Sequence, residues 1–184
     1  MLRLRRIFEL LVVPHMSKRA LKIYLTKLPK KALEEQLLEL YSKFPEVKTY
    51  YDFAFNPKED KLVQDAKARI SNEYFPLKRK RPKARRSVAQ KFIKHFIKLG
   101  VDPVLIADVM CFNLEIAQTF SVEKNVPDAF YKSMANSFAE LTQFVSLHGI
   151  LPEFKERILK IYKETQHQHW LYEEEFSRAL DIID

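Results

Sequence analysis

The residues of this chain whose types and spacing could do chemistry are mainly cations. The segment from residue 77 to residue 99 contains ten Lys or Arg residues and no Asp or Glu. A run this dense repels itself unless something negatively charged lies against it, so it predicts contact with a polyanion. The ten candidate contact residues are Lys78, Arg79, Lys80, Arg81, Lys83, Arg85, Arg86, Lys91, Lys94 and Lys98.

Two different elements are expected to present these cations. Pro76 and Pro82 predict that residues 76–86 are not helical, because proline interrupts a helix ladder. Ser87 is expected to cap a helix that ends at Gly100. On that helix Lys91, Lys94, His95 and Lys98 are spaced i, i+3, i+4 and i+7, which places them on one face opposite an apolar face.

A basic loop that leads into a basic helix face suits the phosphate backbone of RNA or DNA, which such cations bind by releasing counterions. No zinc finger, RNA-recognition sheet or helix-turn-helix glycine is visible, so base-specific reading is not predicted. Other interpretations stay open. The loop could dock on an acidic protein surface, as in a helical adaptor or a self-associating scaffold. It could also be solvated without a partner, or serve as a nuclear import signal.

Residues suited to catalysis or metal binding are few and isolated. Glu164 and His167 form one Glu-x-x-His motif, whereas a helical di-metal site needs two such motifs and two further glutamates. Asp108 and Glu115 lie on another predicted helix without a second motif. Cys111, the only cysteine, lies among apolar residues, where a buried and unreactive thiol is expected. We therefore predict a non-enzymatic binding protein with no catalytic residue, metal or cofactor.

The composition predicts helices. Only two of 184 residues are glycine, while hairpin turns and phosphate-binding loops both need this residue. A hydrophobic content of 47% supplies enough core material for a single compact all-α bundle of about seven amphipathic helices. Charge is unevenly divided: residues 1–100 carry 25 basic and 10 acidic side chains, and residues 101–184 carry 7 and 14. This division predicts a basic and an acidic face.

Helix boundaries are marked by capping residues. Ser17 is expected to cap the first helix, Pro29 to start the second, and Asn56 with Glu59 to cap a later one. The first two helices, within residues 16–44, are expected to form an N-terminal pair and a possible subdomain of a domain that spans residues 16–184. The aromatic residues between residues 50 and 55 are expected to pack rather than to stack on bases.

The first 15 residues are predicted to be an extension or an alternative-start leader, because they imitate a signal peptide poorly. No run of about 18 apolar residues is present, so no membrane span is predicted.

Several short stretches resemble an uncharacterised bacterial family of small all-helical proteins, a domain of unknown function. They are Met16–Lys22, Leu33–Tyr41, Val47–Phe53, Asn56–Pro57 and Leu99–Pro103. The resemblance covers about residues 16–168. It implies an all-helical fold and a bacterial cytoplasmic protein, and it supplies no activity, cofactor or site residue.

Overall fold

The protein is helical throughout its described part. A computed structural model describes residues 17–77 and 81–183, and within these residues there is no strand. They divide into two units between Phe55 and Asn56, which are described separately below. The predicted all-α class is confirmed. The predicted extension, residues 1–15, lies outside the described residues.

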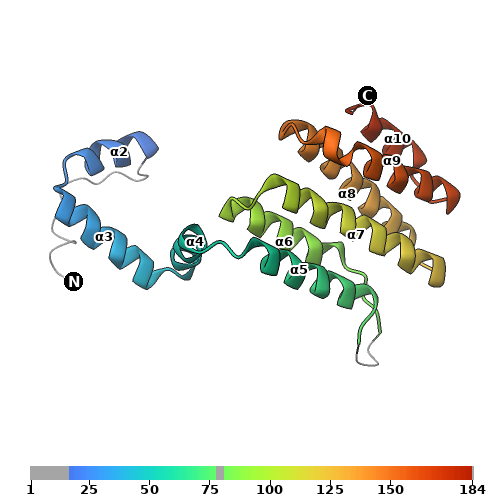
Figure 1. Cartoon of the computed structure of the whole chain (residues 1–184), viewed down its shortest axis with the longest axis horizontal. Helices are drawn as coiled ribbons and strands as arrows, with labels where there is room; N and C mark the ends of the chain where they lie inside the picture. Colours follow the sequence, from blue (N-terminus) through green and yellow to red (C-terminus); the bar gives the residue numbers. More distant parts are fainter. Residues whose placement is uncertain (1–16, 78–80, 184) are drawn as a thin grey trace. The chain divides into compact units, whose positions relative to one another are not determined.

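The N-terminal unit contains three helices, α2 (Lys18–Thr26), α3 (Lys30–Lys43) and α4 (Pro45–Phe55) (Figure 1). The predicted cap of α2 is confirmed, because the Ser17 hydroxyl accepts a hydrogen bond of 3.1 Å from the backbone N–H of Ala20. Pro29 immediately precedes α3 instead of being its first residue. Contacts between α3 and α4 join the second and third helices of the unit.

Helix α4 raises the number of helices in the described residues to nine, where about seven were predicted. Pro45 is its first residue, and the fixed φ of proline suits that position. Glu46 follows in the first turn, where a carboxylate is favoured by the helix dipole. The rings of Tyr51 and Phe55, one turn apart, stack at a centroid distance of 6.2 Å.

The C-terminal unit is a bundle of six helices in which α7 is the central element. Its helices are α5 (Glu59–Tyr74), α6 (Arg86–Leu99), α7 (Pro103–Glu123), α8 (Asp128–Leu147), α9 (Leu151–His167) and α10 (Glu173–Leu180). Helix α7 packs against α5, α6, α8 and α9, and α10 packs against α8 and α9 (Figure 1). Large fully buried side chains from all six helices form the core, among them Tyr74, Phe96, Leu114, Phe138, Ile158 and Phe176.

The ends of α5 and α6 agree with the sequence only in part. Gly100 ends α6 as predicted, with φ at 78°, in the left-handed region that suits glycine. Helix α5 begins at Glu59, and Asn56 does not cap it. Instead of completing a capping box, Glu59 accepts a hydrogen bond of 3.1 Å from the backbone N–H of Asp102. This contact ties the start of α5 to the connection between α6 and α7.

Among the described helices, α7 alone is long and apolar enough to cross a membrane by length and composition. No such span was predicted from the sequence. Of its most apolar window, 56% is buried inside the unit, as is usual for the core helix of a bundle. Two polar residues of α7, Asn113 and Gln118, are buried with it, and Gln118 donates a hydrogen bond of 2.7 Å to the backbone carbonyl of Ile161.

Candidate polyanion-binding surface

The outer face of α6 carries the predicted cations. Lys91, Lys94, His95 and Lys98 are all exposed, while Ala89, Ile93, Phe96 and Leu99 on the other side of the helix are buried. No Asp or Glu occurs in α6. Within the described residues the three lysines make no hydrogen bond or ion pair, so their charges face solvent without a partner. The predicted helix face is thus present in the structure.

The connection from α5 to α6 is fixed at its base by Glu73. Its side chain accepts two hydrogen bonds of 2.9 Å from the Arg85 guanidinium, and its backbone carbonyl accepts two of 3.0 Å from the N–H groups of Lys83 and Ala84. Hydrogen bonding and charge from Arg85 lower the pKa of the Glu73 carboxyl. These bonds join the last turn of α5 to the residues just before α6. Figure 1 shows the connection between the two helices.

Arg86 is held against α8. Its Nε donates a hydrogen bond of 2.7 Å to the Ser137 hydroxyl, and its Nη2 lies 2.6 Å from a carboxylate oxygen of Glu140. Gln90 Nε2 donates a hydrogen bond of 2.7 Å to the other carboxylate oxygen of Glu140. Only 25% of the Arg86 side chain is exposed, so this residue links α6 to α8.

The seven predicted contact residues that precede Lys91 fall into three groups. Lys78, Arg79 and Lys80 lie outside the described residues. Arg81 and Lys83 are exposed in the loop, and their side chains make no hydrogen bond or ion pair with described residues. Arg85 and Arg86 are paired with carboxylates. The described part of residues 76–85 contains no helix, and α6 begins at Arg86, one residue before the predicted cap.

One cation near this surface was missed by the sequence analysis. Arg69 of α5 is exposed and places its guanidinium over the ring of Phe92, 6.0 Å from the centroid. Helices α5 and α6 pack against each other, so Arg69 extends the basic surface beyond α6. No local spacing in the sequence indicates this contact, because 23 positions separate the two residues.

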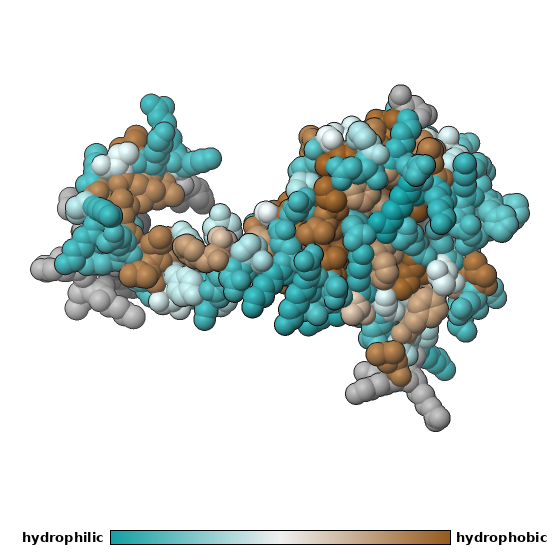
Figure 2. Space-filling view, viewed as in Figure 1, coloured by the Kyte–Doolittle hydropathy of each residue, from teal (hydrophilic) through white to brown (hydrophobic). Residues whose placement is uncertain are grey.

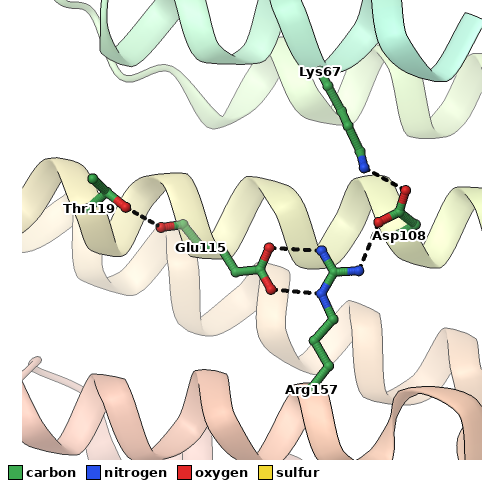
Figure 3. A network of polar contacts seen from close by, with 5 residues as sticks. All are labelled: Lys67, Asp108, Glu115, Thr119 and Arg157. Carbon is green, nitrogen blue, oxygen red and sulfur yellow. Dashed lines mark hydrogen bonds and ion pairs between the residues drawn. The ribbon is translucent and has the colours of Figure 1, made fainter.

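A second polar cluster lies where α5, α7 and α9 meet, and its side chains are partly exposed (Figure 3). The Arg157 guanidinium donates hydrogen bonds of 2.7 and 2.8 Å to Glu115 and one of 2.8 Å to Asp108. Lys67 donates one of 2.6 Å to the other oxygen of Asp108. The cluster thus holds two cations and two carboxylates, and it links three helices.

The charges of this cluster balance, which suits a structural role. Burial raises the pKa of Asp108, but hydrogen bonds from Lys67 and Arg157 outweigh it, and the net pKa is lowered. Hydrogen bonding to Glu115 raises the pKa of Arg157. In the described part of the chain, no three His, Cys, Asp or Glu residues are grouped so that they could hold a metal ion.

An open groove of about 540 Å³ lies between α7 and α9, next to this cluster. Glu115, Glu123, Lys160 and Glu164 line it together with neutral side chains. Three of these four charged residues are carboxylates, so the groove presents a mainly negative surface that does not suit a phosphate. The outer face of α6, which carries only cations, suits a polyanion better than this groove does.

The model of a family of unknown function, DUF6155, matches residues 16–184, and the chain belongs to this family. No curated protein and no solved structure shows significant similarity to the chain.

Proposed function

We propose that this member of the DUF6155 family is a non-enzymatic, cytoplasmic protein that binds the phosphate backbone of nucleic acid through α6 and the loop before it. The observation that carries the proposal is the outer face of α6. There Lys91, Lys94 and Lys98 are exposed and lie beyond ion-pairing distance of any described carboxylate. Surface lysines that are not held by carboxylates are available to replace the counterions of a polyanion.

The spacing of these lysines suits a repeating phosphate chain. At a rise of 1.5 Å per residue, Lys91 and Lys98 are separated by about 10 Å along the helix axis. One strand of B-DNA advances 3.4 Å per phosphate along its own axis, so the face spans roughly three phosphates. Lys94 lies between the two ends. A single helix face can thus follow a short stretch of backbone.

Arg85 and Arg86 have a supporting role in this proposal. Their guanidinium groups are bound to Glu73 and Glu140, and exchanging those carboxylates for phosphates would release the base of the loop from α5 and α8. We therefore assign them to positioning the loop beside the N-terminal end of α6. The loop cations that meet phosphate are then Arg81 and Lys83, together with Lys78, Arg79 and Lys80 outside the described residues.

Binding by this surface is expected to be independent of base sequence. Phe92, the aromatic side chain next to Lys91, is half-buried under Arg69, which leaves its ring poorly placed to stack on a base. The named cations contact phosphates, which are the same at every position of a strand. RNA and DNA therefore differ for this surface only in backbone shape.

Fluorescence anisotropy of the full chain with a generic single-stranded RNA and a generic duplex DNA, over a series of salt concentrations, tests the proposal. We expect binding that weakens as salt rises and that does not depend on the probe sequence. Changing the order of the bases at constant length provides the control for sequence independence. If neither probe binds at low salt, the proposal is wrong, and the predicted alternative, docking on an acidic protein surface, is favoured instead.

A further inference from the structure

The N-terminal unit has amphipathic helices but no core of its own. None of the residues 17–55 is buried, whereas every helix of the C-terminal unit buries at least two side chains. A helix stripe of apolar residues normally exists to be covered by another element. Within residues 17–55 the apolar stripes have no such covering element.

The uncovered apolar side chains form stripes on the helices. On α2, Leu21 and Leu25 are one turn apart, with exposed fractions of 42% and 36%. Leu37 and Leu40 of α3 and Phe44, which directly follows the helix, are exposed by 43%, 44% and 49%. Figure 2 shows hydrophobic residues on the visible surface of this unit, over α2 and the C-terminal end of α3.

Polar contacts hold the three helices together beside these stripes. Gln36 Nε2 of α3 donates a hydrogen bond of 2.7 Å to the Tyr24 hydroxyl of α2. The Tyr41 hydroxyl of α3 donates one of 2.8 Å to Asp52 of α4. These contacts fix how the helices are arranged without burying the leucines. The unit therefore presents apolar side chains on helices that polar contacts join.

We propose that a second copy of the same chain covers this surface, so that residues 17–55 of two chains form a symmetric dimer. A folded unit of below about 40 residues generally needs a disulfide, a metal or an oligomer, because it buries too little surface alone. Residues 17–55 contain no Cys and no His, so neither a disulfide nor a usual zinc site is available. An oligomer supplies the missing core.

The charges of α3 are compatible with a second copy of the same surface. Lys30 pairs with Glu34, and Lys43 pairs with Glu39, each within α3. On α3 cations and carboxylates are therefore interspersed beside the apolar stripe, whereas residues 18–27 carry four cations and no carboxylate. A two-fold interface brings a surface against itself, which the mixed and partly neutralised rim of α3 tolerates.

The available area also agrees with a dimer. The exposed parts of Leu21, Leu25, Leu37, Leu40, Phe44, Tyr50 and Phe55 amount to roughly 700 Å² per copy, if a fully exposed large side chain presents about 200 Å². Two copies would bury about 1,400 Å², which lies within the usual range of specific interfaces.

The molar mass of the full chain in solution, measured by light scattering after size exclusion, tests this inference. We expect twice the chain mass of 21.9 kDa, unchanged between about 0.1 M and about 1 M salt because the contact is apolar. The double variant L37E/L40E is expected to be monomeric. The matched control V122E/L147E, which places the same charges at exposed sites of α7 and α8, is expected to remain a dimer.

Hydrogen exchange of the wild-type chain tests the association without a variant, so the result does not depend on whether L37E/L40E folds. On dilution, amides of residues 17–55 are expected to lose protection, while those of α7 keep theirs. A monomeric wild-type chain at all concentrations overturns the inference, and so does a dimer that survives L37E/L40E. The variant K91Q/K94Q/K98Q is expected to leave the mass unchanged, so this test is independent of nucleic-acid binding.

Discussion

Arg85 and Glu73 are joined by two parallel hydrogen bonds of 2.9 Å, and this pair closes the base of the basic loop. Glu73 belongs to the last turn of α5, and Arg85 directly precedes α6. A bidentate guanidinium–carboxylate pair fixes both distance and orientation. The densest part of the basic run thus includes an arginine whose Nε and Nη2 are already bound to a carboxylate.

Acid is expected to destabilise the protein through its paired carboxyls. The pKa values of Glu73 and Asp108 are lowered in the folded state, so each pair contributes its full stability above the unfolded values, about 4.3 and about 3.9. This contribution is lost as pH falls through the lowered folded values. Urea unfolding at neutral pH and near pH 3 measures the loss.

The variant D108N identifies the part of this acid sensitivity that comes from Asp108. We expect a smaller difference in unfolding free energy between the two pH values than in the wild type. The control E174Q changes an exposed carboxyl of α10 that makes no ion pair with described residues. Equal pH dependence in D108N and E174Q would contradict the account of the cluster.

Arg157 is expected to stabilise the junction of α5, α7 and α9. The variant R157M removes three hydrogen bonds and leaves Glu115 without a cation, while Asp108 keeps Lys67. Because these side chains are about one-third exposed, we expect a loss near the lower end of the range for charged pairs, about 1–2 kcal/mol. Chemical denaturation measures it.

The control for this prediction is R178M, which removes an exposed arginine from α10. That arginine makes no hydrogen bond or ion pair with the described residues, so its loss is expected to change stability very little. If R157M and R178M unfold at the same denaturant concentration, the cluster contributes no stability.

Cys111 is expected to be chemically silent in the folded protein. Its side chain is fully buried in α7, and burial raises the pKa of the thiol to about 12. Since the thiolate is the reactive form, a thiol-specific chromogenic reagent at mildly alkaline pH should label the native chain very slowly. Full labelling after addition of denaturant is the control. Fast labelling of the native protein would contradict this placement of α7.

The sequence predicts the elements of this fold better than their contacts. Ser17 caps the start of α2 and Gly100 ends α6, as expected, because capping depends on local backbone geometry. The burial of Cys111 also follows from its apolar neighbours. The additional helix α4 was missed, although Pro45 followed by Glu46 is a recognisable start. The predicted cap with Asn56 and Glu59 was wrong, because the Glu59 side chain accepts a hydrogen bond from Asp102, a residue far along the chain.

For the candidate surface too, the helix face was predicted from the sequence and the contacts between helices were not. The face of Lys91, Lys94 and Lys98 follows from helical spacing alone, and the structure contains it. The pairing of Arg86 with Glu140 depends on how α6 packs against α8, which no local pattern encodes. For the same reason Asp108 and Glu115 were noted as carboxylates on one helix, but their shared partner Arg157 was not.

The absence of buried side chains in residues 17–55 could not be predicted from local pattern. Leucines at helical spacing, such as Leu33, Leu37 and Leu40, indicate an apolar face in any amphipathic helix. Whether the same chain or another one covers that face is decided by packing. The sequence therefore predicts the stripe, and the structure adds that residues 17–55 themselves do not cover it.

The salt dependence of duplex DNA binding by K91Q/K94Q/K98Q tests the central proposal most directly. The control K124Q/K132Q/K163Q has the same net charge but changes exposed lysines of the C-terminal unit outside α6. We predict that the α6 variant weakens binding and reduces the slope of log affinity against log salt by about 2 to 3 units, close to 0.9 per lost phosphate contact. The control should keep the wild-type slope. Equal slopes for the two variants would contradict the assignment of α6 as the phosphate-binding surface.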